Sequence, residues 1–359
     1  MAVRARDMPK ESLDSLYAKV VKKTLTETLH LHRGDSVTVE TWDSGLDFAR
    51  RAVAEARAIG CTAVMIYEDE GAYVEGVRRA PEDLVGKMGK NEYGLLAGTD
   101  AYVFIPGQAL GAYSKTLKPE ERERSTRYNS SWYEAASKAG LRGARLTFGY
   151  VGKDLAGYLG KKRQDVVRAQ LAAALVDYGQ IARSAGRVSP LLTDGAKAEL
   201  RSGRSSLTFT LQGELSVEDG MVDDNDVKTG NNVAYVPPGF VSKDIAPDSA
   251  NGTVTLSESV TKVGVVHGAQ LEFREGRLIS WESEDRAKLK NLVEALPAEK
   301  RRAELLTVGL NPAFGFGWGQ DRFVEGSLTL AGFGLTGVVK KGALSVAGSK
   351  IVADGRLTA

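Results

Sequence analysis

Histidine and cysteine are the scarcest residues of this sequence that could hold a metal ion. The chain carries three histidines, His30, His32 and His267, and one cysteine, Cys61. His30 and His32 stand at positions i and i+2 before a strand, in the first half of the chain, and His267 precedes a glycine-bounded hairpin. We therefore expect structural or solvent-facing roles for the histidines. A lone Cys61 excludes an intrachain disulfide and a thiolate metal cluster, which is typical of a reducing cytoplasm.

A run of acids in MVDDNDVKTG resembles a calcium-binding loop. It contains Asp223, Asp224 and Asp226. It lacks the glycine and the bidentate glutamate of an EF-hand loop, and Asx-rich turns are common between strands. We favour a turn here over a calcium site.

A second acidic cluster, Glu68, Asp69 and Glu70, follows an apolar strand. The carboxyl end of a parallel strand commonly faces a ligand crevice. The cluster therefore could contact a substrate amine or a cation, although a solvated loop is the interpretation that we favour.

Other catalytic signatures are weak in this sequence. No Gly-x-Ser-x-Gly elbow accompanies a histidine, so a Ser-His-Asp triad is not indicated. The glycines of FGFGWGQ, residues 314–320, do not follow the strand-to-helix pattern of a dinucleotide fingerprint. We interpret that segment as an aromatic-glycine loop packing over the second half of the chain.

Length and charge limit the class of protein. With 359 residues the chain is long enough for two domains. Hydrophobic residues make up 42% and charged residues 26%, which is ordinary for a soluble globular protein. A net charge of +2 gives no electrostatic reason to expect nucleic acid or an anionic membrane. No apolar run is long enough to span a membrane, so we expect a cytoplasmic protein.

The first half alternates strands and helices. Short apolar or alternating runs predict strands at Ser36–Trp42, Thr62–Glu68, Ala101–Ile105 and Ala144–Tyr150. Helical periodicity follows between them: a helix capped by Ser44 and stopped by Gly60, one through Trp132–Lys138, and one over about Arg163–Ala185. This alternation predicts a parallel sheet with crossover helices.

The pattern changes near Pro190. From Ser205 onward, short strands such as SSLTFTLQGEL, AYVPPG and GTVTLSES are separated by Gly, Asn and Asp, and a helix capped by Ser283 interrupts them. The sequence therefore predicts two domains: an α/β parallel-sheet domain over residues 1–189, and a strand-rich, barrel-like α+β domain over residues 190–359.

Several motifs occur in the order found in the thermophilic aminopeptidase T family. NVAYVPPGFVSKDIAPDSANG resembles the family's metal-site entry loop, and LTFTLQG and LEFREGRLIS flank it in the same order. TVGLNP resembles a Gly-x-Asn-Pro loop, SLTLAGFG a family strand, and VAGSKIVADGRL the closing hairpin. The resemblance implies the family's two-domain fold over nearly the whole chain.

The resemblance also implies positions for metal ligands, and this sequence departs from them. Family members bind two metal ions through two Glu, two His, a Tyr and an Asp. Here the first Glu position is Phe240, the second falls on Leu305 with Glu304 one residue away, and a His position falls on Thr329. Residues 334–348 contain no Tyr, His or Asp. A phenyl ring or an aliphatic chain cannot bind a dication, and on a regular strand Glu304 would face away from Leu305.

Two functions follow from this departure. The first is a catalytically inactive homologue that binds no cofactor and keeps the fold for a binding, scaffold or self-assembly role. The alternative is an active, divergent metallopeptidase that releases N-terminal amino acids with relocated zinc, cobalt or manganese ligands.

The family's homodimers suggest that this chain forms a dimer or a larger homo-oligomer through its second domain. Four aromatic residues in glycine-flanked loops could anchor such an interface or a pocket, because they bury much area at little entropic cost. They are Phe314, Phe316, Trp318 and Phe333. Closing the core of their own domain is the alternative role for the same residues.

Overall fold

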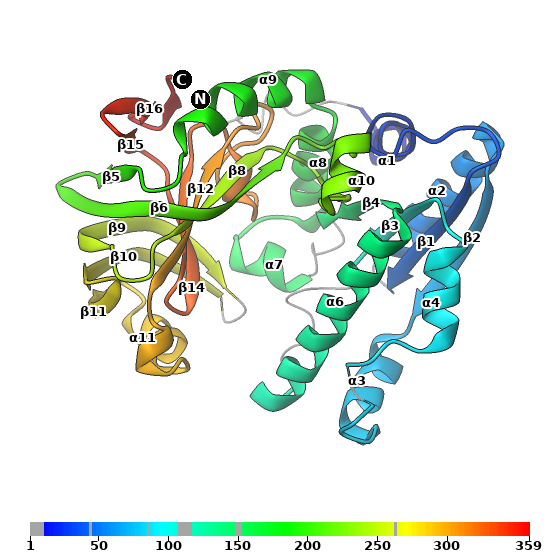
Figure 1. The fold of residues 1–359 in the computed structure, drawn as a ribbon, viewed down its shortest axis with the longest axis horizontal. Coiled ribbons are helices and arrows are strands. Elements are labelled where there is room, and N and C mark those ends of the chain that lie inside the picture. Colours follow the sequence, from blue (N-terminus) through cyan, green and yellow to red (C-terminus); the bar gives the residue numbers. More distant parts are fainter. Residues whose placement is uncertain (1–10, 43–44, 85, 107–116, 148–152, 262–263) are drawn as a thin grey trace.

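The protein is built from two separate sheets. The computed structural model describes residues 11–42, 45–84, 86–106, 117–147, 153–261 and 264–359. Within them, a five-stranded sheet is surrounded by helices, and a twelve-stranded antiparallel sheet forms the other part of the molecule (Figure 1). The predicted fold class, an α/β part plus a strand-rich part, is confirmed.

The first sheet is parallel throughout, in the order β2-β1-β3-β4-β7. Its strands are β1 (Ser36–Trp42), β2 (Thr62–Glu68), β3 (Ala101–Ile105), β4 (Arg142–Leu146) and β7 (Val233–Val236). The central strand β3 is almost wholly apolar and buried, as expected when helices cover both faces.

The helices of this part mostly connect its strands. They are α1 (Leu13–Lys23), η2 (Thr24–Thr28), α2 (Leu46–Ile59), α3 (Glu70–Arg79), α4 (Lys90–Ala97), α6 (Pro119–Ala139), α7 (Lys153–Tyr158), α8 (Arg163–Ala174), α9 (Tyr178–Val188) and η5 (Ser189–Leu191). Helix α2 ends at Gly60 in the left-handed region, with φ of 101°, as the sequence predicts. The predicted cap Ser44 lies outside the described residues.

Two helix predictions need correction. The helix expected over about Arg163–Ala185 is two helices, α8 and α9, because Asp177 takes an extended conformation before Tyr178. The helix expected through Trp132–Lys138 is the last part of the much longer α6. Amphipathic spacing continued across the first break, which is why periodicity alone did not reveal it.

The segment AYVPPG also differs from its prediction. We expected it among the strands of the second domain, but β7 pairs in parallel with β4 and completes the first sheet. The chain thus returns to the first sheet after entering the strand-rich part. The boundary between residues 189 and 190 stays a prediction.

The strand-rich part contains a closed barrel. Strands β6, β8, β12, β13, β14 and β9 are successive neighbours, and β9 pairs back onto β6. The twelve strands are β5 (Lys197–Ser202), β6 (Ser205–Glu218), β8 (Phe240–Ile245), β9 (Asn251–Thr261), β10 (Gly264–Arg274), β11 (Arg277–Glu282), β12 (Ala303–Gly309), β13 (Leu328–Gly332), β14 (Leu335–Val339), β15 (Gly342–Val346), β16 (Ser349–Ala353) and β17 (Arg356–Leu357). Val241, Leu306 and Leu330 belong to the cluster that fills the interior. The barrel-like prediction is confirmed.

Short helices connect the strands of the second half of the chain. They are α10 (Asp224–Thr229), α11 (Arg286–Glu294), η6 (Ala298–Lys300) and η7 (Asp321–Phe323). Helix α11 begins after Asp285 rather than at the predicted cap Ser283. The Asp285 carboxylate instead binds Lys288 and His267.

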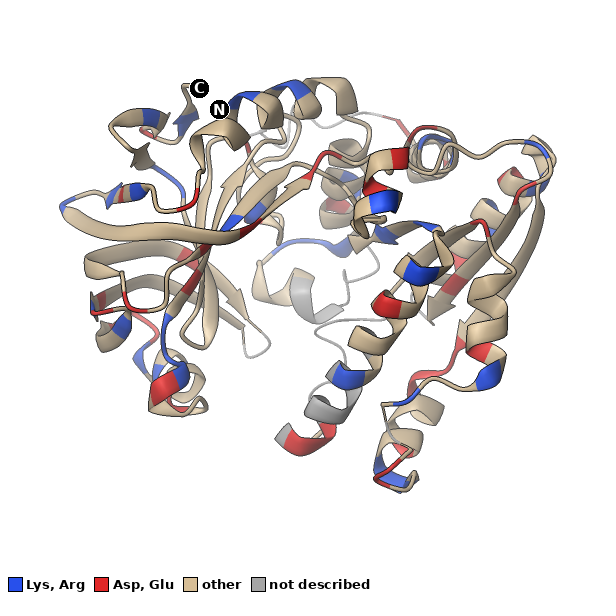
Figure 2. Cartoon of the chain, in the orientation of Figure 1, with Lys and Arg blue, Asp and Glu red and all other residues tan. Residues whose placement is uncertain are grey.

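Basic residues, in blue, and acidic residues, in red, occur in both parts of the molecule (Figure 2). Among the described residues, no helix combines the length and apolar character that crossing a membrane requires.

Candidate functional site at the junction of the two sheets

Three of the predicted positions share the outer face of the barrel. Phe240 on β8 lies opposite Gly309 of β12, and Thr329 on β13 lies opposite Thr307 of β12. Leu305 lies two residues before Thr307 on the same strand. Since neighbouring residues of a strand point to opposite faces and Val241, Leu306 and Leu330 point inward, Phe240, Leu305 and Thr329 all point outward.

Glu304 lies on that same outer side, contrary to our expectation from strand alternation. The pairing register between β12 and β13 shifts between Ala303 and Leu305, so Glu304 is the extra residue of a β-bulge. Ala303 and Leu306 are both fully buried in the barrel core, whereas Glu304 is exposed and Leu305 half-buried. The Glu304 carboxylate borders a surface hollow of about 440 Å³.

The donor set around these positions does not suit a divalent cation. The Ser242 and Thr307 hydroxyls, adjacent on the outer face, hydrogen-bond to each other at 2.8 Å. The Thr329 hydroxyl is buried and has no hydrogen-bond partner. Within the described ranges, no group of three His, Cys, Asp or Glu side chains could hold a metal ion. Neutral hydroxyls and apolar groups do not compensate the desolvation of a dication.

The Phe240 ring is enclosed by aromatic rings and a cation. Its centroid lies 6.3 Å from that of Tyr235 and 5.4 Å from that of Phe323, both edge-on. The Arg322 guanidinium carbon lies 5.6 Å from the Phe240 centroid and 4.8 Å from that of Phe323. A dication at the place of the ring would be repelled by this guanidinium by roughly 6 kcal/mol at an effective dielectric constant of about 20.

A second arginine continues this arrangement into the parallel sheet. Phe104 of β3, Arg145 of β4 and Tyr235 of β7 are direct neighbours across three strands. The Arg145 guanidinium carbon lies 5.4 Å from the Phe104 centroid and 5.8 Å from that of Tyr235, and the same group donates to the Tyr133 hydroxyl at 2.9 Å. We call Phe104, Arg145, Tyr235, Phe240 and Arg322 the arginine-aromatic row.

The pKa of the Tyr235 phenol shows which charges of the row act on this side chain. Burial is the main cause that raises its pKa, and the nearby Tyr133 phenol adds to that rise. Arg145 and Arg322 both act in the opposite direction, because each positive charge favours the phenolate. Both arginines are thus close enough to Tyr235 to act on the same atom.

A third cation, Lys340, has a different environment. Its ammonium lies 2.7 Å from a carboxylate oxygen of Glu258 and 3.4 Å from one of Asp321. Asp321 also accepts hydrogen bonds from the backbone of Gly317 and Trp318. We call Lys340, Glu258 and Asp321 the lysine cluster. Because η7 contains Asp321, the cluster fastens the loop before β13 to the barrel.

One asparagine explains why two of the sequence motifs adjoin. The Asn311 side chain of the GLNP motif donates to the carbonyls of Pro238, at 2.8 Å, and Ala173, at 3.1 Å. Gly239, at φ of 123°, lies so close to Asn311 that a Cβ there would come within 2.7 Å of it. The VPPG and GLNP segments therefore depend on a glycine at position 239.

One histidine and two acids of the acidic clusters make structural contacts. His267 pairs with Asp285 at 3.0 Å, and the His30 and Cys61 regions contribute no metal group among the described residues. Asp223 caps α10 by accepting from the backbone of Asn225 and Asp226. Asp69 caps α3 in the same way.

The four aromatic residues considered for an interface pack largely within the chain. Phe333 is fully buried against Phe273 in the barrel core, with ring centroids 5.4 Å apart. Phe314 and Trp318 are buried against the first part of the molecule, and the partly buried Phe316 packs beside them. Phe314, Trp318 and Phe333 therefore offer little surface for a contact between copies, whereas Phe316 stays partly exposed.

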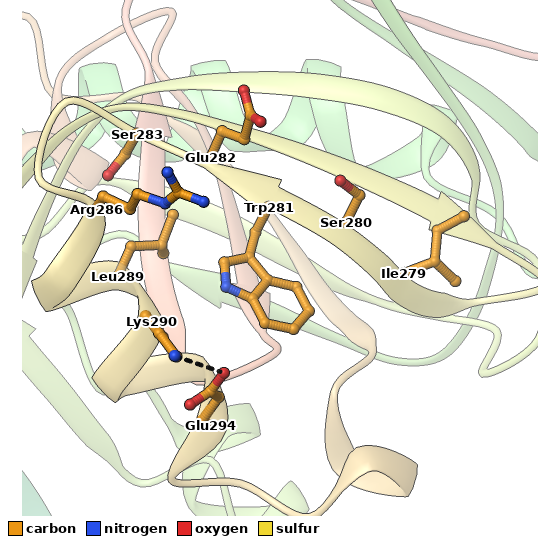
Figure 3. A pocket seen from close by; sticks show the side chains of 9 residues that line it. All are labelled: Ile279, Ser280, Trp281, Glu282, Ser283, Arg286, Leu289, Lys290 and Glu294. Atoms are coloured by element: carbon orange, nitrogen blue, oxygen red, sulfur yellow. Dashed lines mark ion pairs between the residues drawn. The ribbon is translucent and has the colours of Figure 1, made fainter.

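A hollow of about 320 Å³ lies between β11 and α11, away from the predicted positions. Figure 3 shows Trp281 at its centre, with Arg286 and the ion pair of Lys290 and Glu294, 3.9 Å apart, on the helix side. Acidic and basic groups alternate around the hollow, so it favours neither an anionic nor a cationic ligand.

The fold is that of aminopeptidase T. The chain superimposes on wild-type AmpT from Thermus thermophilus with a TM-score of 0.67 at 15% identity, covering 97% of this chain and 100% of that one. A 2,5-dihydroxypyridine dioxygenase from Pseudomonas putida KT2440 matches with a TM-score of 0.63 at 12% identity, over 97% and 99% of the chains. No protein-family model and no curated protein sequence matches. Enzymes named for two different reactions share this architecture, so the fold alone does not decide the function.

The sequence predictions missed Arg145, Arg322 and Lys340. None of them belongs to a recognisable motif, and no spacing in the sequence links Arg145 to Arg322. Only the return of β7 to the first sheet, beside β4, brings Tyr235 and then Phe240 between them.

Proposed function

We propose that this chain is a metal-independent binding protein built on the aminopeptidase T fold, a homologue without the peptidase activity. One observation carries the proposal: at the first ligand position, Phe240 is packed between Tyr235 and Phe323 with the Arg322 guanidinium over its ring. A metal centre needs negative or lone-pair donors there. This position has an apolar ring and a positive charge.

The proposal is tested by metal content and by activity. Protein purified without chelator is dialysed and analysed for zinc, cobalt and manganese, and assayed for release of N-terminal amino acids with each metal added. We expect substoichiometric metal and no metal-dependent release. Stoichiometric metal together with release would overturn the proposal.

The alternative, a divergent metallo-aminopeptidase, is favoured by one observation. The bulge at Glu304 turns its carboxylate to the same side as Leu305, so one of the family's two glutamate positions retains an acid nearby. If metal-dependent activity is found, Glu304→Gln should abolish it and Glu299→Gln, an exposed acid nearby in sequence, should not.

We also propose that the chain self-associates, as the family's homodimers suggest. The burial of Phe314, Trp318 and Phe333 within the chain removes them as the contact surface. Light scattering after size exclusion measures the mass directly. A single-chain mass across micromolar concentrations would reject self-association.

A further inference from the structure

The outer edge of the parallel sheet is apolar and exposed. Strand β2 is the first in the order of that sheet, so among the described residues it pairs with a strand on one side only (Figure 1). Its exposed side chains are Val64 at 52%, Met65 at 42% and Tyr67 at 48%, which are three of the seven large hydrophobic side chains that the described residues leave exposed. Such a concentration on one edge strand is typical of a surface that pairs with another strand.

Most of the features that keep free sheet edges apart are missing from β2. Natural proteins protect such an edge with charged side chains, proline or a bulge. Residues 62–67, TAVMIY, contain no charged residue and no proline, and the register with β1 is unbroken. Along the described strand we find one protection, a hydrogen bond of 3.0 Å from the Arg57 guanidinium to the Ala63 carbonyl. The backbone of Met65, at the middle of the strand, is therefore available to a partner.

The direction of the backbone groups sets the register of such a partner. Thr62 donates its N–H to the Asp35 carbonyl, at the start of β1, and the backbone groups of successive residues point to opposite sides of a strand. Ala63 therefore points to the free edge, as its bond with Arg57 shows, and Met65 does so too. Because Met65 is the central residue of the seven in β2, an antiparallel copy with the greatest overlap pairs Met65 with its own equivalent.

The charges at the two ends of β2 favour this antiparallel arrangement. At the amino end, Arg33 and Arg57 are exposed, and neither forms an ion pair with another described residue. The carboxyl end is acidic, with Glu68 followed by Asp69 and Glu70. Burial raises the pKa of Glu68, and repulsion from Asp69 adds to that rise. An antiparallel copy brings each acidic end beside the basic end of the other chain, whereas a parallel copy would bring like charges together.

We infer that a second copy of this chain pairs with β2 in the antiparallel direction about a two-fold axis at Met65, so that two five-stranded sheets form one continuous sheet. The inference rests on the proposed self-association and names its surface. That surface belongs to the first sheet, not to the strand-rich part that the family resemblance implies. A two-fold contact uses the same residues of both chains, so it closes at a dimer.

Light scattering after size exclusion of the full chain tests the inference with matched lysine variants. Met65→Lys sets two like charges opposite each other at the axis, so the two-chain mass expected of the natural protein should fall to a single-chain mass, with the affinity of the dimer lowered at least about tenfold. Ile279→Lys changes an apolar side chain of similar exposure, 44%, on β11 and should keep the two-chain mass. Circular dichroism checks that both variants fold, and Val64→Lys replaces Met65→Lys if that variant does not.

Cysteine cross-linking tests the register. In the inferred pair the Cα atoms of Met65→Cys and its equivalent lie about 5.5 Å apart, which suits a disulfide, so mild oxidation should give a covalent dimer. Thr62→Cys is also exposed on β2, but the two copies of residue 62 lie about 20 Å apart at about 3.4 Å per residue and should not cross-link. The natural chain, whose Cys61 is buried, is the blank.

The outcomes separate this inference from the proposed self-association. A single-chain mass for the natural protein rejects both. A two-chain mass that Met65→Lys leaves unchanged, or that Ile279→Lys abolishes equally, overturns the inference and leaves self-association standing. Failure of Met65→Cys to cross-link, or cross-linking of Thr62→Cys to the same extent, overturns the antiparallel pairing at Met65.

Discussion

Two cationic regions of this molecule differ in what surrounds the charge. In the lysine cluster, Lys340 contacts two carboxylates, and the Asp321 side chain is only 4% exposed. In the arginine-aromatic row, Arg145 and Arg322 lie over rings and remain partly exposed. Lys340 is itself partly exposed and lies 5.6 Å from the Phe316 centroid, so what distinguishes the lysine cluster is the buried Asp321 carboxylate that depends on its cation. Removing the lysine charge should therefore cost more stability than removing the charge of Arg322.

The largest effect is expected from removing the charge of the lysine cluster. Lys340→Met leaves Asp321 buried without its cation, which should lower the free energy of unfolding by about 2 to 4 kcal/mol. Urea denaturation measures this, and Lys341→Met, at the exposed neighbouring position, should change it by less than about 0.5 kcal/mol. Equal effects of the two substitutions would remove the distinction between the regions.

The acid at the end of the arginine-aromatic row should make stability depend on pH. Burial raises the pKa of Glu40 to about 7, and its hydrogen bond from Tyr102 acts against that shift. Because the folded pKa lies above the usual value, the folded state loses stability as the pH rises from about 4.5 through 7. Glu40→Gln should be more stable than the natural chain at pH 8 by roughly 1 to 2 kcal/mol, less than the full shift implies because Glu40 is partly exposed.

Melting curves of both proteins at pH 5 and pH 8 check this expectation. The difference in stability should disappear at pH 5, where Glu40 is protonated in the folded protein. A difference of the same size at both pH values would show that the glutamine acts through packing instead.

The hydroxyls of Thr307 and Thr329 on the outer face of the barrel should respond unequally to two similar substitutions. Thr307→Val breaks the 2.8 Å bond to Ser242 and should cost about 1 kcal/mol. Thr329→Val removes a buried hydroxyl that has no partner and should be neutral or slightly stabilising. Thermal unfolding of both variants side by side decides this, and a larger loss for Thr329→Val would indicate an interaction of that hydroxyl.

The smallest effect on stability is expected in the arginine-aromatic row itself. Arg322→Met loses cation–π contacts with Phe240 and Phe323 that are worth about 0.5 to 1 kcal/mol each at partly exposed sites, and the methionine stem restores part of the packing. Urea denaturation should therefore show a loss under about 1 kcal/mol. A loss as large as that of Lys340→Met would remove this difference between the two regions.

Local patterns predicted much of the architecture. The apolar run at Ala101–Ile105 and the alternation at Ser36–Trp42 are strands β3 and β1, and the stop at Gly60 ends α2. These features depend on neighbours in the sequence, since periodicity and a left-handed glycine act within a few residues. The break at Asp177 and the pairing of β7 were not predictable in this way, because a strand partner is chosen by long-range contacts.

The sequence by itself determined that Phe240, Leu305 and Thr329 stand where the resemblance implies metal ligands, since residue type is local information. The tertiary structure alone decided what replaces those ligands. The bulge at Glu304 arises from the register between β12 and β13, which no single strand encodes. The placement of Arg145, from one sheet, and of Arg322, from η7, over the neighbouring rings of Tyr235 and Phe240 requires both folds to be complete, because the attraction between charge and ring acts over only about 6 Å.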